Sequence, residues 1–309
     1  MKNTVFLFPG QGSQRVGMSK DLLDEYRTIS ENYFNKAQKI LGYDIKDLCY
    51  KGPEEKINNT RYTQPAIFTV SAITLDILAE NGIHPSSAAG HSLGEYTALF
   101  SAGVFDFTTG LNIVKERGRL MSEVDEVSDQ NGFMAAVIGL DIEEIQDICS
   151  RAKGVLEIAN INSPQQIIIS GTKKAFDLAR EEFENQGAKK IIELEVSGAF
   201  HSSLMKPVEK KFRSFLEEYE FDSPKITVIG NINARPLSTP KEIKNELYNQ
   251  LTGTVNWVES MNYFMNKEQD MFVECGPGRV LRGLMRYIDR SADIYSINSV
   301  KNLSRLKKE

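Results

Sequence analysis

A serine at the centre of a glycine-rich turn is the residue best suited to act as a nucleophile in this sequence. Ser92 lies in Gly90-His91-Ser92-Leu93-Gly94, a G-x-S-x-G pentapeptide that arises by chance about once in ten chains of this length. Small residues precede it and an expected helix follows, which is the setting of a nucleophile elbow. Such a turn presents the hydroxyl at a helix N-terminus and leaves the Leu93 amide free to donate. The alternative is a structural turn whose serine only caps the helix.

A serine hydroxyl becomes an effective nucleophile when a base removes its proton, and the sequence offers three histidines. His91 adjoins Ser92, and neighbouring side chains diverge on a tight turn, so it is a poor base. His84 precedes a proline in a polar connector and is expected to be solvated. His201 follows an expected small subdomain, at a junction where clefts form. On its own such a histidine is more often structural, but beside Ser92 it is the expected base.

The group that orients His201 is not evident from the sequence. No acidic residue stands out, and more than 100 residues follow His201, unlike the histidine of an ordinary α/β-hydrolase. A neutral acceptor, such as a backbone carbonyl that holds Nδ1–H, could take that place.

A second glycine-rich loop, Gly10-Gln11-Gly12, offers backbone amides at the end of the first expected strand. Its spacing matches neither a dinucleotide-binding loop nor a Walker A loop. We expect the Gln11 amide to lie opposite that of Leu93 as a second oxyanion donor, because losing one such donor typically costs about 10²–10³ in rate. The alternative is a purely structural turn.

One arginine falls on the apolar face of an expected helix over residues 107–124. At about 100° per residue, Arg117 shares a face with Gly110, Ile113, Val114, Leu120 and Met121, whereas Lys115 and Arg119 point away. An inward-facing arginine needs an anionic partner, because an unpaired buried charge is costly. That partner is either a structural Asp or Glu or a substrate carboxylate bound by the guanidinium. The second choice predicts transfer of an acyl group that carries a free carboxylate.

Composition excludes several classes of protein. The 309 residues include 37 Lys+Arg and 42 Asp+Glu, a net charge of −5, and nucleic-acid binders usually carry a basic excess. No apolar run approaches the roughly 20 residues of a membrane helix, and the start of the chain does not resemble a secretory signal. Three cysteines without a CxxC pair argue against a disulfide framework or a zinc cluster. We expect a cytoplasmic protein with one large domain or two unequal ones.

The hydrophobic pattern predicts an α/β fold with a parallel sheet. Before the middle of the chain, strands are expected at residues 5–8 and 87–90, and helices at 65–81, 93–101 and 107–124. The polar stretch 121–132 is expected to be a boundary. After residue 200, we expect helices at 205–219 and 280–288 and strands at 226–231 and 271–275. The basic tail 301–308 is expected to be a solvated terminus.

Between these parts lies a block with the order βαββαβ, the ferredoxin-like motif. Its expected strands are residues 133–140, 155–161, 166–170 and 190–196, and its helices are 142–152 and 176–185. We therefore expect a small subdomain over residues 129–197, inserted into a large domain formed by residues 1–128 and 198–309.

These residues lie in segments that resemble malonyl-CoA:acyl-carrier-protein transacylases over essentially the whole chain. The matching segments are Phe8-Pro-Gly-Gln-Gly-Ser-Gln14, Gly90-His-Ser-Leu-Gly-Glu95, Arg117-Gly118 with Met121, Met134-Ala-Ala136, Ala159-Asn-Ile-Asn-Ser-Pro164, Gly198-Ala-Phe-His-Ser202 and Glu274-Cys-Gly-Pro-Gly278. The resemblance implies a large α/β-hydrolase-like domain with a ferredoxin-like insert, in agreement with the pattern. Residues 94–100 and 196–201 are most similar to discrete acyltransferases that serve polyketide synthases in trans.

The resemblance also implies a role for each site residue. It makes Ser92 the nucleophile, His201 its base, and Arg117 the ligand of the malonyl carboxylate. The amides of Gln11 and Leu93 form the oxyanion hole by the same comparison. Gln250 matches the family glutamine whose main-chain carbonyl orients the histidine, which explains the missing acid. The resemblance places three further residues at the acyl pocket. Phe200 fits the pattern associated with malonyl rather than branched acyl units, and Met121 and His91 are expected to line the pocket.

The resemblance implies a ping-pong acyltransferase that moves malonyl from malonyl-CoA to the phosphopantetheine thiol of an acyl carrier protein, or of a polyketide synthase carrier domain. Exchange between thioester and ester is nearly balanced, so no metal, bound cofactor or ATP is expected. One rival is a hydrolase that clears stalled acyl groups from carriers, and another is a non-catalytic docking module. The sequence leaves open the pathway (polyketide or fatty acid), the carrier, the strictness for malonyl, the CoA contacts and the oligomeric state.

Overall fold

A six-stranded sheet forms the centre of the larger part of the chain, in a computed structural model that describes residues 3–127, 132–196, 198–267 and 271–308. Its order is β10-β9-β1-β2-β7-β8, and every neighbouring pair is parallel except β7 and β8. The strands are β1 (Thr4–Phe8), β2 (Ser87–Gly90), β7 (Thr227–Ile229), β8 (Pro236–Leu237), β9 (Met271–Cys275) and β10 (Ile294–Ile297). The predicted α/β fold with a largely parallel sheet is confirmed.

Strand β1 lies inside the sheet and is buried on both faces, which explains its unbroken apolar sequence. Phe6 and Phe8 pack into a core with helices on one side, while Val5 and Leu7 pack with α12 and α13 on the other. The register pairs Phe8 with Gly90, so the loops that follow β1 and β2 emerge side by side at the carboxyl edge of the sheet. In open α/β sheets this edge is where ligands bind.

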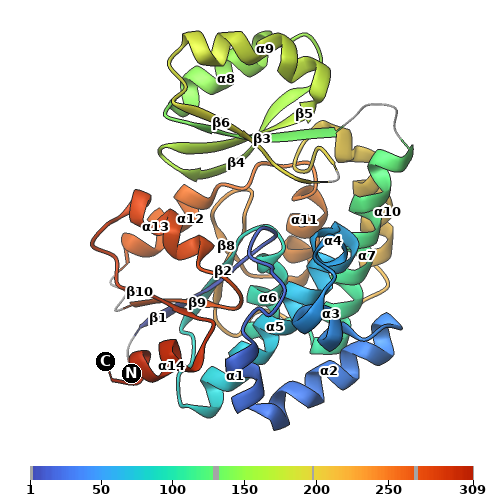
Figure 1. Cartoon of the computed structure of the whole chain (residues 1–309), viewed down its shortest axis with the longest axis vertical. Helices are drawn as coiled ribbons and strands as arrows, with labels where there is room; N and C mark the ends of the chain where they lie inside the picture. Colours follow the sequence, from blue (N-terminus) through green and yellow to red (C-terminus); the bar gives the residue numbers. More distant parts are fainter. Residues whose placement is uncertain (1–2, 128–131, 197, 268–270, 309) are drawn as a thin grey trace.

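Helices surround this sheet, as Figure 1 shows. In the first half of the chain they are α1 (Lys20–Glu25), α2 (Arg27–Leu41), α3 (Ile45–Lys51), α4 (Glu54–Asn58), α5 (Thr60–Glu80), α6 (Gly94–Ser101) and α7 (Phe107–Val127). In the second half they are the short η1 (Ser203–Met205), α10 (Lys206–Leu216), α11 (Pro240–Asn249), α12 (Trp257–Met265), α13 (Val280–Ile288) and α14 (Val300–Leu306). Helix α5 packs along α7.

Two helix boundaries predicted from the sequence need correction. Helix α5 begins at Thr60 rather than at Pro65, because the Asn59 side chain caps it by accepting from the Arg61 amide at 3.0 Å. Helix α7 continues to Val127, so the boundary predicted from residue 121 is wrong as far as 127, and residues 128–131 lie outside the described part.

The basic tail is not a solvated terminus. It forms α14, whose Leu303 and Leu306 are buried while its lysines stay exposed. Three apolar residues, Val300, Leu303 and Leu306, are a weak amphipathic signal in a short basic segment, and packing against β10 decides the outcome.

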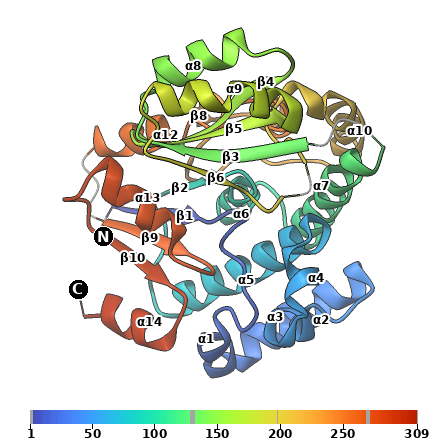
Figure 2. The ribbon, with the colours of Figure 1, turned by 45° about the horizontal axis from the view of Figure 1, so that its top comes forward.

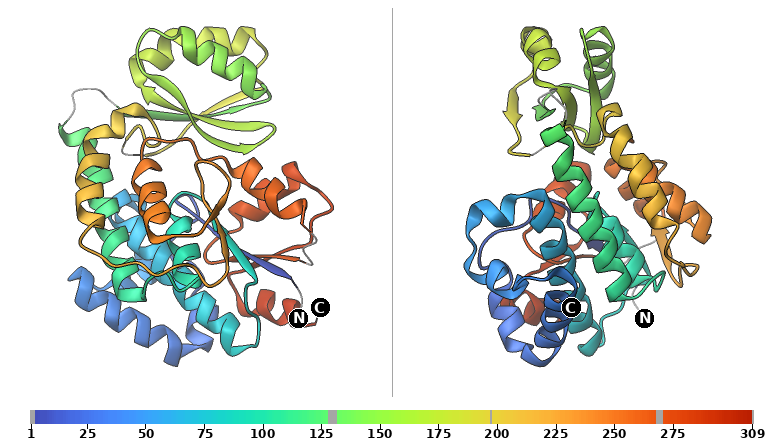
Figure 3. Two further views of the ribbon diagram at one scale, coloured as in Figure 1. Left: turned by 180° about the vertical axis from the view of Figure 1, so that it is seen from behind. Right: turned by 90° about the vertical axis from the view of Figure 1, so that its right-hand side faces the viewer.

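A second, four-stranded sheet with two helices stands at one end of the molecule, and both chain termini lie toward the other end (Figure 3). Its strands are antiparallel in the order β4-β5-β3-β6. The elements are β3 (Gly132–Ile138), α8 (Ile142–Arg151), β4 (Leu156–Ser163), β5 (Gln166–Thr172), α9 (Lys173–Asn185) and β6 (Lys190–Glu193), in the expected order along the chain. Strand β6 ends earlier than predicted, because residues 194–196 leave the sheet and line a cavity.

The small sheet presents two different faces (Figure 2). Along β3, Phe133, Ala135 and Val137 pack beneath α8 and α9, whereas Met134 and Ala136 face the larger part. This alternation follows from the period of two along a strand. The small sheet therefore forms a wall opposite the carboxyl edge of the large one.

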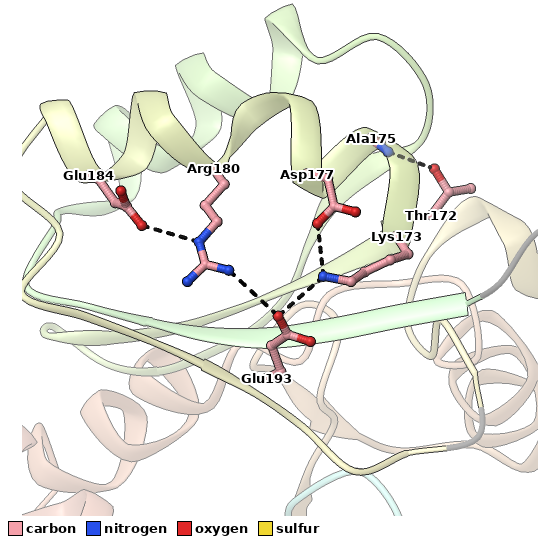
Figure 4. A network of polar contacts seen from close by, with 7 residues as sticks. All are labelled: Thr172, Lys173, Ala175, Asp177, Arg180, Glu184 and Glu193. Atoms are coloured by element: carbon pink, nitrogen blue, oxygen red, sulfur yellow. Dashed lines mark hydrogen bonds and ion pairs between the residues drawn. The ribbon is translucent and has the colours of Figure 1, made fainter.

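A network of charged side chains ties strand β6 to helix α9 (Figure 4). Glu193 lies 3.2 Å from Lys173 and 3.9 Å from Arg180, and these cations also pair with Asp177 at 2.8 Å and Glu184 at 3.1 Å. Exposed pairs of this kind contribute about 0–1 kcal/mol each. The network therefore orients the edge strand more than it stabilises the fold.

Candidate active site

A cavity of about 360 Å³ lies between the carboxyl ends of β1 and β2 and the inner face of the small sheet. The large sheet and its loops contribute mainly polar residues, and the small sheet contributes mainly apolar ones. The lining comprises Gln11, Gly12, Gln14, Gln64, His91, Ser92, Leu93, Arg117, Met121, Met134, Ala136, Asn160, Asn162, Gln166, Ile168, Ile192, Leu194, Glu195, Val196, Phe200 and His201. Eight of the nine residues predicted for the site are among them, and Gln250 lies directly behind.

Ser92 occupies a sharp turn between β2 and α6, and its backbone φ of +49° is one that residues other than glycine rarely adopt. A Cβ on Gly94 would lie 1.9 Å from the Phe8 carbonyl oxygen, so the helix start approaches β1 more closely than any other residue allows. Asn231 supports the turn: its Oδ1 accepts from the Ser92 amide and its Nδ2 donates to the Gly90 carbonyl, both at 2.7 Å. The strain is thus held by packing and by one buried amide side chain.

His201 contacts Ser92 through its side chain. Its Nε2 lies 2.9 Å from Ser92 Oγ, and its Nδ1 lies 2.7 Å from the main-chain oxygen of Gln250. The carbonyl fixes the tautomer, because it accepts only from a protonated Nδ1 and leaves Nε2 free to accept the serine proton. Burial and then the positive charge of Arg117 lower the pKa of His201 to about 3, so the imidazole is neutral at pH 7.

Arg117 lies on the buried face of α7, as the helical spacing predicts, and is 1% exposed. Its Nη2 donates to Ser92 Oγ at 3.1 Å and to Gln250 Oε1 at 2.9 Å. Its Cζ lies 5.3 Å from the ring centroid of Tyr96. Among the described residues no ion pair joins Arg117 to an Asp or Glu, and its Nε has no hydrogen-bond partner. The guanidinium therefore keeps donors available beside the serine.

Other predicted residues surround this trio. Gln11 and Leu93 belong to the loops after β1 and β2, and a Cβ on Gly10 would meet the His91 oxygen at 2.4 Å, which shows how closely those loops approach. His91 does not reach the serine hydroxyl: its Nε2 lies 2.7 Å from Asn162 Oδ1. Met121 and Phe200 form part of the apolar wall, whereas His84 is exposed and does not line the cavity.

Several polar residues of the site were not anticipated from the sequence. Asn231 follows the carboxyl end of β7. Because ligand sites of open α/β sheets lie at this edge, a polar residue directly after a strand was the available signal for Asn231. Gln64 is buried in α5, where its Nε2 lies 3.2 Å from the Met121 sulfur and its Oε1 has no hydrogen-bond partner in the described part of the chain. A glutamine within an apolar helix face carries the same signal that identified Arg117.

The sequence model described as "Acyl transferase domain" matches residues 5–308 of the chain. The chain belongs to this acyl transferase family. Acyl transfer to a serine uses a hydroxyl beside a neutral base, and here Ser92 Oγ lies 2.9 Å from His201 Nε2 and 3.1 Å from Arg117 Nη2.

Curated and solved acyl transferases resemble the chain over more than nine-tenths of its length. The protein named polyketide biosynthesis malonyl CoA-acyl carrier protein transacylase PksC, from Bacillus subtilis strain 168, is 41% identical over 93% of this chain and 98% of its own. An acyl-carrier-protein S-malonyltransferase from Burkholderia pseudomallei 1710b has a TM-score of 0.95 at 38% identity and covers all of both chains. A complex of a type II PKS acyl-carrier protein with its malonyl-transacylase contains a chain with a TM-score of 0.95, at 36% identity over 99% of each.

Within the described ranges, no helix is long and apolar enough to span a membrane. Over the same residues, no group of three or more His, Cys, Asp and Glu is placed to hold a metal ion.

Proposed function

We propose that this protein is a malonyltransferase that moves malonyl from malonyl-CoA to the phosphopantetheine thiol of an acyl carrier protein through a malonyl ester of Ser92. The observation that carries the proposal is the position of the Ser92 hydroxyl, 2.9 Å from the His201 imidazole and 3.1 Å from the Arg117 guanidinium. The acyl carbonyl and the far carboxylate must therefore lie only a few atoms apart. A short dicarboxylic acyl group such as malonyl meets that requirement.

In the first half-reaction, Ser92 Oγ attacks the thioester carbonyl while His201 Nε2 takes its proton. The imidazolium is stabilised because Nδ1–H donates to the Gln250 carbonyl. Collapse of the tetrahedral intermediate breaks the C–S bond, and the CoA sulfur leaves with the proton from His201. The product is a malonyl ester on Ser92 and free CoA, so atoms and charge balance.

The amides of Gln11 and Leu93 are proposed to stabilise the oxyanion. Both residues line the cavity beside Ser92, on loops that the pairing of β1 with β2 brings together. Fixed donors at the position where negative charge develops are usually the largest single contribution to acyl-transfer catalysis.

The second half-reaction reverses the first with a different thiol. His201 takes the proton of the carrier's phosphopantetheine thiol, the sulfur attacks the malonyl ester, and Ser92 recovers its proton as the C–O bond breaks. A transferase must favour the thiol over water at this stage. The apolar wall formed by Met121, Met134 and Phe200 serves that exclusion.

Arg117 is proposed to select malonyl in two ways. Its guanidinium binds the carboxylate, and a planar guanidinium does so with two parallel hydrogen bonds. The bound carboxylate also neutralises the charge that lowers the pKa of His201, so the base becomes stronger when the correct acyl group is present. An acetyl group provides neither effect.

The fold of the proposed enzyme is inferred to be an α/β-hydrolase-like domain of residues 1–128 and 198–309 with a ferredoxin-like subdomain of residues 129–197. The strand order β4-β5-β3-β6 with both helices on one face supports the ferredoxin-like part. The tight turn after β2 supports the hydrolase-like part. Residues 128, 129 and 197, where the boundaries fall, lie outside the described part.

Polyketide synthesis is the proposed pathway, because the relative in Bacillus subtilis carries that name and residues 94–100 and 196–201 resemble discrete trans-acting enzymes. The proposed partner is an acyl carrier protein or a carrier domain, the kind of complex formed by one structural neighbour. The reaction needs no metal or bound cofactor, and we propose that it takes place in the cytoplasm.

Intact-mass measurement tests the proposed function. The wild-type protein should gain one malonyl group from malonyl-CoA, lose it to a carrier thiol, and gain little acetyl from acetyl-CoA. Ser92→Ala should abolish labelling, and the control Ser101→Ala at the end of α6, outside the cavity lining, should not. Rapid loss of the malonyl group to water would indicate the hydrolase instead, and no adduct at all would indicate a docking module.

A further inference from the structure

A buried carboxyl group lies directly behind the serine turn and takes no part in the chemistry described above. Glu95 occupies the first turn of α6 and is 0% exposed. Its Oε1 accepts from the Asn231 main-chain amide at 3.3 Å, and its Oε2 accepts from Gln250 Nε2. Burying a carboxyl group is costly even when it is hydrogen-bonded, so the position of Glu95 behind the serine turn calls for a functional explanation.

The Gln250 side chain connects this carboxyl group to the substrate pocket. Its Oε1 accepts from Arg117 Nη2 at 2.9 Å, and its Nε2 donates to the Ser92 carbonyl at 3.1 Å as well as to Glu95. A guanidinium can only donate, and a carboxylate can only accept. Turning the amide over would place N–H against N–H and oxygen against oxygen, so the two charged neighbours permit only one orientation.

We propose that Glu95 is a positioning residue that fixes the Gln250 amide and thereby aims Arg117 at the substrate carboxylate without neutralising it. A direct Glu–Arg ion pair would occupy the N–H groups that a malonyl carboxylate needs. The neutral amide between them avoids that competition: Arg117 is anchored through Nη2, while its Nε has no hydrogen-bond partner among the residues that the structure describes. This inference rests on the proposed role of Arg117 in malonyl selection.

The proposed role of Glu95 does not depend on whether its carboxyl group is ionised. Burial raises its pKa and the nearby carboxyl of Glu246 raises it further, while hydrogen bonds from Gln250 and Asn231 and the charge of Arg117 lower it. Either form keeps an acceptor oxygen toward Gln250 Nε2. The proposal therefore predicts that an acceptor at this position matters more than a negative charge.

The test compares Glu95→Leu, which removes the acceptor, with Glu95→Gln, which keeps one. The measurement is the ratio of the initial rates at which malonyl-CoA and acetyl-CoA label the protein, followed by intact mass. Both rates scale with the folded fraction, so a merely structural loss leaves the ratio unchanged. Glu274→Leu is the matched control, since Glu274 is equally buried and hydrogen-bonded to Ser296 Oγ and two main-chain amides.

We expect Glu95→Leu to lower the malonyl-to-acetyl ratio by about tenfold or more, the effect of disturbing one charge-assisted hydrogen bond. Glu95→Gln should restore the ratio to within about threefold of wild type, and Glu274→Leu should leave it unchanged. If Glu95→Leu does not fold, Gln250→Leu removes the same link from the other side, keeps the main-chain carbonyl, and should lower the ratio equally.

An unchanged ratio in folded Glu95→Leu, or in Gln250→Leu where it stands in, would overturn the inference, and so would a ratio for Glu95→Gln as low as that for Glu95→Leu. Arg117→Leu, measured in parallel, separates this failure from that of the proposed function. If Arg117→Leu leaves the ratio unchanged, the selective role of Arg117 is wrong. If it lowers the ratio while Glu95→Leu does not, only the role of Glu95 is wrong.

Discussion

Replacing Arg117 with alanine removes the one group proposed to recognise the malonyl carboxylate. The guanidinium is 1% exposed, so a bound carboxylate would form hydrogen bonds that are shielded from water. Two such charge-assisted bonds contribute about 3–6 kcal/mol together. Because Nη2 must release Ser92 Oγ to make them, the lower value is the better guide. A loss of about 3 kcal/mol corresponds to about 10²-fold in kcat/KM for malonyl-CoA.

Acetyl-CoA should respond differently to the same substitution. It has no carboxylate to lose, and removing the guanidinium takes away a charge that lowers the pKa of His201. Its labelling rate should stay level or rise. The assay is competitive labelling with both thioesters, read by intact mass.

Arg119→Ala is the matched control on the opposite face of α7. Arg119 pairs with Glu116 and Glu123, both at 2.6 Å, and does not line the cavity. It should leave the malonyl-to-acetyl ratio unchanged. Equal losses for both thioesters in Arg117→Ala would refute the reasoning, because they would show that Arg117 supports the fold or the serine rather than the carboxylate.

Three further outcomes follow from the site. Because the pKa of His201 is about 3, the base becomes protonated only as the pH falls toward 3. The value of kcat/KM for labelling should therefore stay constant from about pH 7.5 to about pH 5. A fall in kcat/KM centred near the ordinary histidine pKa of about 6.5 would contradict this prediction. Gly94→Ala should prevent folding, because its Cβ would lie 1.9 Å from the Phe8 carbonyl oxygen. In the control Gly283→Ala, the new Cβ would have nothing within 4 Å, so thermal unfolding should show a stability equal to that of the wild type or up to about 1 kcal/mol higher. Asn231→Ala should lower the free energy of unfolding by about 2–4 kcal/mol, since two buried partners lose their hydrogen bonds, and a change below about 0.5 kcal/mol in denaturant titration would contradict its supporting role.

Parts of the fold with strong local signals were predictable. The unbroken apolar run of β1 and the small-residue strand β2 were located within one residue, and α13 was located to the residue. Periodicity alone also placed Arg117 on the buried face of α7. These features depend on spacing within a single element, which a sequence displays directly.

Features that depend on contacts between distant segments were not predictable. Helix α14 is stable because two leucines pack onto the body of the protein, and the sequence around them is basic. Helices α1 to α4 were not predicted either, although local caps mark some of their ends: Gly42 follows α2 with a positive φ, and the Asp44 side chain caps α3. The start of α5 was missed because an asparagine cap six residues before Pro65 outweighs the usual preference of proline for a first turn.

The residues of the site also divide into those with a local signal in the sequence and those that depend on distant partners. Ser92, His201 and Arg117 each stand out by residue type within a recognisable context, and the structure brings them within 3.1 Å of a common hydroxyl. Asn231 and the link from Glu95 through Gln250 do not stand out, because their meaning depends on partners more than 130 residues away. A lone polar residue at the end of a strand reveals nothing of which turn it supports.

A crystal structure of the protein after reaction with malonyl-CoA tests the site most directly. We predict a malonyl ester on Ser92 whose two carboxylate oxygens lie about 2.7–2.9 Å from guanidinium N–H groups of Arg117. The ester carbonyl oxygen should face the amides of Gln11 and Leu93. A malonyl carboxylate that points to solvent or to another cation, with Arg117 still bonded to the serine oxygen, would contradict the proposed basis of selection.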